Sequence, residues 1–187
     1  MNPVTTSEAA DSPSHPDRTG GAISAEIEDP AGSVAGVGHF GIQVADIERS
    51  VAFYEQLIGL ELVARWTRDQ EYIQDLVGYP GVELHVAVFR LPKSDACLEV
   101  LEYKNVERSP VDPGTANPGT AHLCLYVEDL EAVYDRLKNE GVTFVSEPKT
   151  PTIPPNKGGR VVYMLDPDGI RIELLQTRLT LAGEPRP

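Results

Sequence analysis

The chain repeats one pattern of apolar and polar positions. The pattern begins after residue 36 with a stretch in which apolar and polar residues alternate. An Asp follows, and then apolar residues at helical spacing. It occurs in "GHFGIQVADIERSVAFYEQLIGLEL" and again in "GTAHLCLYVEDLEAVYDRLKNEGV". Asp46 and Asp129 lie where a helix N-cap is expected. His39 and His122 are 83 residues apart, and so are the two Asp residues. This period predicts two copies of one strand–helix unit.

Both helices are predicted from an apolar stripe that can pack on a sheet. Gly59 and Gly141 follow the stripes, where a helix often ends in the left-handed conformation. The stripes consist of Ile47, Val51, Tyr54 and Ile58 in the first copy and of Leu130, Val133, Tyr134 and Leu137 in the second.

Three strand-like segments follow each helix, so each half is predicted to be βαβββ and the fold class α+β. The segments are 60–67, 82–91 and 96–103 in the first half and 142–147, 159–166 and 170–176 in the second. Two Pro/Gly-rich loops, 104–119 and 147–159, are too long for hairpins and are typical of lids or binding loops.

These elements define one domain, 36–178, made of two modules, 36–104 and 119–178. Residues 1–35 are rich in Ser, Pro, Gly, Ala, Asp and Glu without sustained periodicity, which predicts a disordered tail. Residues 179–187 are expected to form a C-terminal tail.

Composition narrows the range of partners. The 187 residues carry a net charge of −13, which argues against nucleic acids and anionic membranes. No segment is apolar for long enough to span a bilayer, and the N-terminus lacks the features of a secretory signal. Two cysteines make no disulfide framework. We expect a cytoplasmic protein that acts on a small molecule.

Four polar side chains interrupt the predicted strands. His39, Glu99, His122 and Glu173 each lie opposite the apolar face of their strand, near its centre. Taken singly, a strand His is more often a satisfied structural residue, and a strand Glu usually points at solvent. Together they occupy equivalent places in the repeat, and two imidazoles with two carboxylates can hold a divalent metal. The metal's charge would offset the burial of both carboxylates.

The chain resembles the vicinal oxygen chelate superfamily, which includes glyoxalase I, methylmalonyl-CoA epimerase and the extradiol dioxygenases. The resemblance covers about 36–178 and rests on the two stretches quoted above, on "CLEVLEY" and on "GGRVVYMLDPDGIRIELL". It implies two βαβββ modules that form an open barrel around one divalent ion (Mn, Fe, Co, Ni or Zn). The implied metal ligands are His39, Glu99, His122 and Glu173. Glyoxalase I has Glu at the place of Glu99, whereas the epimerases have Gln.

The resemblance implies a metal-dependent isomerase, epimerase or lyase that acts on a small oxygenated carbon acid through a metal-stabilised enediolate. We expect Glu173 to be the shuttling base, with Glu99 as the second choice, and the protein to be a homodimer. Glu83 and His85 share a face of the 82–91 strand, but a catalytic role for them is less expected. The alternatives are an Fe(II) extradiol-type ring-cleaving dioxygenase and a non-catalytic small-molecule-binding protein.

Overall fold

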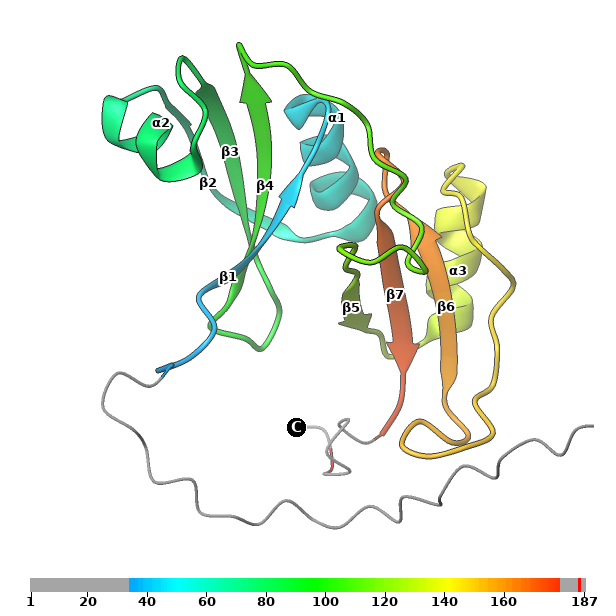
Figure 1. Ribbon diagram of the computed structural model, residues 1–187. Helices are drawn as coiled ribbons and strands as arrows, with labels where there is room; N and C mark the ends of the chain where they lie inside the picture. The colour runs from blue at the N-terminus through cyan, green and yellow to red at the C-terminus, as the bar shows by residue number, and fades with distance from the viewer. Residues whose placement is uncertain (1–33, 179–184, 186–187) are drawn as a thin grey trace, which may run out of the picture. The chain divides into compact units, whose positions relative to one another are not determined.

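The computed structural model describes residues 34–178 and residue 185 (Figure 1). The chain divides after Gly36, and every helix and strand described below lies in the unit 37–187. The two predicted tails, 1–35 and 179–187, lie almost entirely outside the described residues.

The first module contains a four-stranded sheet in the order β1-β4-β3-β2. β1 pairs with β4 in parallel, and the other neighbours are antiparallel. Helix α2 is absent from the predicted pattern, and the second half of the predicted first helix is a π-helical turn that continues α1. The elements are β1 (His39–Gln43), α1 (Ile47–Ala52), the π-helical turn (Phe53–Ile58), β2 (Glu61–Arg68), α2 (Glu71–Val77), β3 (Glu83–Arg90) and β4 (Cys97–Lys104).

The second module contains a three-stranded sheet in the order β5-β7-β6, again with a parallel first pair. Its elements are β5 (Leu123–Tyr126), α3 (Leu130–Asn139), β6 (Arg160–Leu165) and β7 (Arg171–Gln176). The strand expected at 142–147 is reduced to isolated bridges beside β6, at Phe144 and Lys149. Backbone bonds join Val145 to Tyr163 and Lys149 to Val161, but the pairing is interrupted between them.

The predicted helix boundaries are confirmed. The Asp46 carboxylate accepts the backbone N–H of Arg49, and that of Asp129 accepts the N–H of Ala132, both at 3.0 Å. We call α1 and the π-helical turn together, residues 47–58, the first helical segment. Gly59 ends this segment with φ +85°, a conformation that glycine adopts without strain. The N-caps therefore fix where each helix begins after the strand that precedes it, β1 or the strand Leu123–Tyr126.

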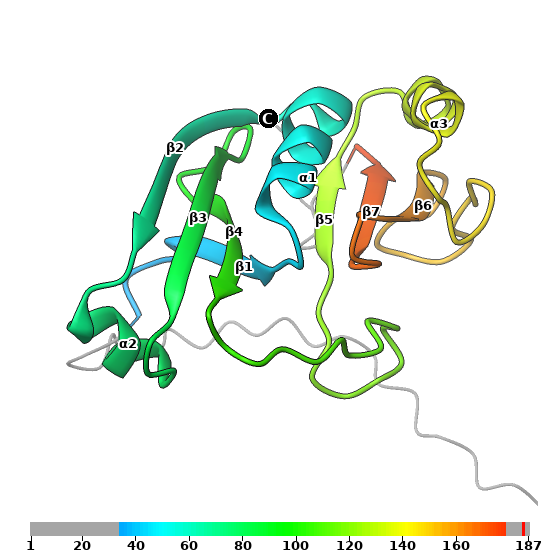
Figure 2. The same ribbon diagram turned by 90° about the horizontal axis from the view of Figure 1, so that it is seen from above.

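One hydrophobic core joins the two modules. The same cluster contains Tyr54 of the first helical segment, Leu98 of β4, Leu130 of α3 and Ile172 of β7, all with an exposed fraction of 0%. Helix α1 lies between the two sheets in both views (Figures 1 and 2). The apolar faces of both sheets are therefore buried in a shared core, and the described strands form two open sheets that do not close into a barrel.

Candidate active site

The first pair of candidate residues comes together on the first sheet. In the parallel register His39 lies beside Cys97 and Gly41 beside Glu99, which places the imidazole and the carboxylate on one face. His39 Nε2 is 3.5 Å from Glu99 Oε2. The side chains are 56% and 22% exposed, so both are open to solvent on the face turned away from the shared core. We call this pair the first half-site.

The second pair occupies the equivalent place on the second sheet. His122 precedes β5, and Glu173 lies on β7 opposite Cys124. His122 Nε2 is 3.2 Å from Glu173 Oε2, with side-chain exposures of 39% and 16%. We call this pair the second half-site. Both copies of the structural repeat thus contain a His–Glu pair at the same place.

Tyr163 is a third member of the second half-site. Its hydroxyl donates to Glu173 Oε2 at 3.0 Å and lies 3.3 Å from His122 Nε2. Its ring packs edge-on against the imidazole, with centroids 5.3 Å apart. Burial, followed by the charge of Glu173, raises the pKa of the Tyr163 hydroxyl to about 12, so it remains a neutral donor at ordinary pH.

Sequence reasoning missed Tyr163 because it lies in the middle of an apolar run, "VVYML", where a tyrosine reads as a core residue. The residue could have been found from the pairing register of the strands β6 and β7. Tyr163 pairs with Glu173 across the antiparallel β6–β7 ladder, so the two side chains must share a face.

Each half-site fits part of a metal-ligand set. Two ligands at about 2.1 Å from one ion lie about 3.0–3.4 Å apart in octahedral or tetrahedral geometry, close to the two Nε2–carboxylate distances. Within the described part of the chain, however, no three His, Cys, Asp or Glu residues gather around one point that could hold a metal. The structure brings together His39 with Glu99 and His122 with Glu173, but not the two half-sites.

Glu83 and His85 form a separate pair. His85 Nε2 is 2.5 Å from Glu83 Oε1, and His85 lies beside Glu102 in the β3–β4 register. By strand alternation, this face is the one opposite Glu99. Neither residue is thus placed with the first half-site.

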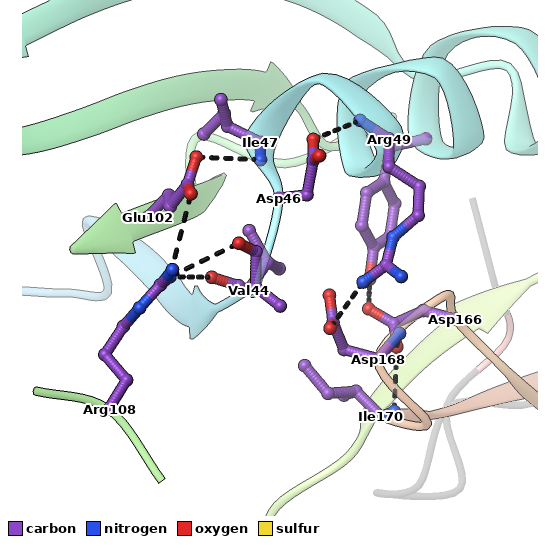
Figure 3. A network of polar contacts seen from close by, with 11 residues as sticks. Val44, Asp46, Ile47, Arg49, Glu102, Arg108, Asp166, Asp168 and Ile170 are labelled. Carbon is purple, nitrogen blue, oxygen red and sulfur yellow. Dashed lines mark hydrogen bonds and ion pairs between the residues drawn. The ribbon is translucent and has the colours of Figure 1, made fainter. Parts of the chain in front are cut away.

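Polar contacts attach the first helical segment to its surroundings (Figure 3). Tyr54 donates to Asp166 at 3.0 Å, and Arg49 donates to Asp168 at 2.6 Å, so both bonds cross from the first module to the turn before β7. Burial raises the pKa of the Asp166 carboxyl, and burial followed by the charge of Asp166 raises that of the Tyr54 hydroxyl.

Glu102 of β4 contacts the first residue of α1, at the start of the first helical segment. Its side chain is 4% exposed, and it accepts the backbone N–H of Ile47 at 3.1 Å, at the start of α1. The same carboxylate lies 3.1 Å from Lys104 and 3.7 Å from Arg108. Arg108 also donates to the carbonyls of Val44 and Ala45, which anchors the loop 104–119 beside the end of β1 (Figure 3).

A cavity of 750 Å³ opens under the loop 104–119. Its wall includes Gln43 of β1 and Tyr103 of β4, which lie on the same sheet face as His39 and Glu99. Small-molecule sites typically measure about 300–1,000 Å³. The long loop therefore contributes to a cavity of ligand size at the ends of β1 and β4, next to the sheet face that carries the first half-site.

The fold and the paired half-sites define an α+β protein of two repeated modules. The chain belongs to the Glyoxalase/Bleomycin resistance protein/Dioxygenase superfamily, whose family profile matches residues 36–174. The resemblance inferred from the sequence is thereby confirmed. Within residues 34–178 and at 185, no helix has the length and apolar character needed to cross a membrane.

Three relatives illustrate the range of the family. A protein from Vibrio parahaemolyticus named "Probable lactoylglutathione lyase" is 30% identical over 148 residues, 78% of this chain and 93% of its own. A "2-epi-5-epi-valiolone epimerase" from an Actinomyces species is 30% identical over 149 residues, 77% of this chain and 80% of its own. Among solved structures, the antibiotic binding protein TnmS3 from a Streptomyces species superposes with a TM-score of 0.51 at 26% identity, covering 77% of this chain and 97% of its own.

Proposed function

We propose that the chain is a metal-dependent isomerase, epimerase or lyase that acts on a small oxygenated carbon acid. The observation that carries this proposal is the repeated His–Glu pair, with its atoms at the spacing of metal ligands. The names of the two enzyme relatives, a lyase and an epimerase, support the same reaction class.

We further propose that the metal site is completed between two copies of the chain. Each half-site offers one imidazole and one carboxylate, and four such ligands still leave room for substrate on a six-coordinate ion. Because the two half-sites do not meet within the described residues, a symmetric dimer is the simplest way to join the first half-site of one copy to the second of the other.

When bound, a divalent ion at these four residues would polarise a substrate carbonyl and stabilise negative charge on its oxygen. Glu173 would take the proton from the neighbouring carbon and return it. His122 and Tyr163 both contact its Oε2, which fixes the carboxylate and leaves Oε1 as its other oxygen. That oxygen is the candidate proton acceptor, and Glu99 is the alternative.

The test is proton exchange in D₂O under argon, with the metal-loaded full chain and a panel of α-hydroxy carbonyl compounds and hemithioacetals. We expect wild-type protein to exchange the α-proton, and Glu173→Gln to lose roughly two or more orders of magnitude for a missing general base. Glu55→Gln, an exposed carboxylate of the π-helical turn, serves as the matched control. Metal content is measured in every sample because Glu173 is also a proposed ligand.

Two outcomes would contradict this proposal. Unchanged exchange in Glu173→Gln at equal metal content would remove Glu173 from the chemistry. Turnover that consumes oxygen and stops under argon would replace the isomerase by a ring-cleaving dioxygenase.

A second candidate function is small-molecule binding without catalysis. The 750 Å³ cavity favours it, and so does the likeness to an antibiotic binding protein. Tight binding of a ligand that shows neither proton exchange nor turnover in metal-loaded protein would support this candidate.

A further inference from the structure

The cavity under the loop 104–119 has a distinct chemical character. Tyr79 and Tyr103 lie in its wall as an edge-to-face pair with ring centroids 5.7 Å apart. Val111 adds an apolar side chain that is 79% exposed. Aromatic rings arranged in this way offer both faces and edges to a flat ligand.

The charged groups of the wall do not favour an anion. Arg108 is the cation of the wall, and its guanidinium is engaged by Glu102 and by two backbone carbonyls. Asp168 is neutralised by Arg49. Glu107 has no partner among the residues that the structure describes, so it leaves an uncompensated negative charge at the wall. An anionic ligand would therefore enter without a free cation to meet it.

The position of the cavity suggests which part of a substrate it receives. Tyr103 lies four residues beyond Glu99 along β4, which is about 13 Å in a strand. Both side chains are on the same sheet face. A ligand whose reacting carbons reach the first half-site can thus extend its remote part toward the two tyrosines.

From these observations we infer that the cavity binds a flat aromatic group without negative charge. The ligand class rests on the cavity alone, whereas its identity as the remote part of the substrate rests on the proposed function. A glutathione conjugate, which carries two carboxylates, does not match this wall. The inference therefore separates this chain from the lyase relatives in its substrate class.

Binding of three naphthalene probes tests the inference by calorimetry on the full chain. The probes are 2-naphthylmethanol, 2-naphthylmethylammonium and 2-naphthoate, which share a ring and differ in charge, and none chelates a metal through vicinal oxygens. We expect the neutral and cationic probes to bind at least tenfold more tightly than naphthoate. Equal or tighter binding of naphthoate, or no binding of any probe, overturns the inference.

Variants locate the bound probe. Tyr79→Ala should weaken the neutral probe about tenfold through lost ring contact. Val111→Lys should tighten naphthoate and weaken the ammonium probe, and Val111→Asp should do the reverse. Ile153→Lys, a 72% exposed position on the other long loop, is the control and should change neither. If the probe affinities do not change in the Tyr79 and Val111 variants, the ligand binds elsewhere and the inference is overturned.

Glu173→Gln separates this result from the proposed function. Glu173 does not line the cavity, so the variant should bind the probes as the wild type does, whether or not it retains proton exchange. Loss of probe binding in this variant would show that the ring sits at the second half-site, and the inference would be wrong. Failure of proton exchange with normal probe binding would count against the proposed function only.

Discussion

Tyr163 distinguishes the two half-sites at the scale of single residues. Glu173 faces a tyrosine on the neighbouring antiparallel strand, whereas Glu99 faces Val88 at the equivalent place. One carboxylate therefore receives a hydroxyl donor and the other an apolar neighbour. This difference makes the two glutamates chemically unequal although the repeat relates them.

We predict that Tyr163→Phe lowers α-proton exchange about tenfold, because one hydrogen bond to a charged group contributes about 1.5 kcal/mol. Metal content should stay within about twofold, since all four proposed ligands remain. The measurement is exchange rate and metal content in the same sample. Wild-type exchange, or loss of the metal, would exclude a positioning role for Tyr163.

Tyr163 also allows a prediction of how the exchange rate depends on pH. Because the pKa of the Tyr163 hydroxyl is raised to about 12, the hydroxyl stays protonated across the neutral range. The ratio of wild-type to Tyr163→Phe exchange rates should accordingly stay constant between about pH 6 and 9.

At the scale of elements, Glu102 is the buried acceptor on which the start of α1 depends. It accepts the Ile47 N–H and neutralises Lys104 and Arg108. Glu102→Ala should lower the free energy of unfolding by about 3 kcal/mol, because a buried N–H and two cations lose their partner. Glu102→Gln keeps an acceptor oxygen and should cost about half as much.

Chemical denaturation measures both variants, with Glu55→Ala as an exposed control that should change stability by less than about 0.5 kcal/mol. Equal losses for the alanine and glutamine variants would mean that the charge matters and the helix-capping bond does not.

Sequence patterns predict the elements whose signals are local. The aspartate N-caps, the apolar stripes and the strand faces of His39 and Glu99 follow from local spacing. Helix α2 was missed because its first turn lacks a capping side-chain bond. The segment 142–147 has strand-like residues, but the prolines that follow it cannot donate to a ladder, and only isolated bridges form.

The candidate site is predictable only in part for a similar reason. Alternation predicts the sheet face of each His and Glu, but the pairing of β1 with β4 and of β5 with β7, which brings them together, is a long-range register. The joining of two pairs depends on how modules or copies associate, and no local period encodes that association.

At the scale of the whole molecule, mixing two inactive variants tests how the half-sites combine. His39→Ala disables every first half-site, and His122→Ala every second one. If metal sites form across a symmetric dimer, random exchange of subunits should restore about a quarter of the sites, because half of the dimers are mixed and each holds one intact site.

Metal content and exchange activity after mixing are the readouts. The matched control mixes His39→Ala with Glu99→Gln, which damage the same half-site and should restore nothing. No recovery in the first mixture, with dimers present, would show that both half-sites of a metal centre come from one copy.

The strand order also has a consequence for synthesis on the ribosome. In both modules the strand made last lies inside its sheet, with β4 between β1 and β3 and β7 between β5 and β6. That same strand carries the glutamate of the half-site. A nascent chain therefore exposes each histidine long before its carboxylate partner exists, and a chain interrupted before β7 lacks both the centre of its second sheet and Glu173. Synthesis of the last strand of each module therefore completes the sheet and the half-site at the same time.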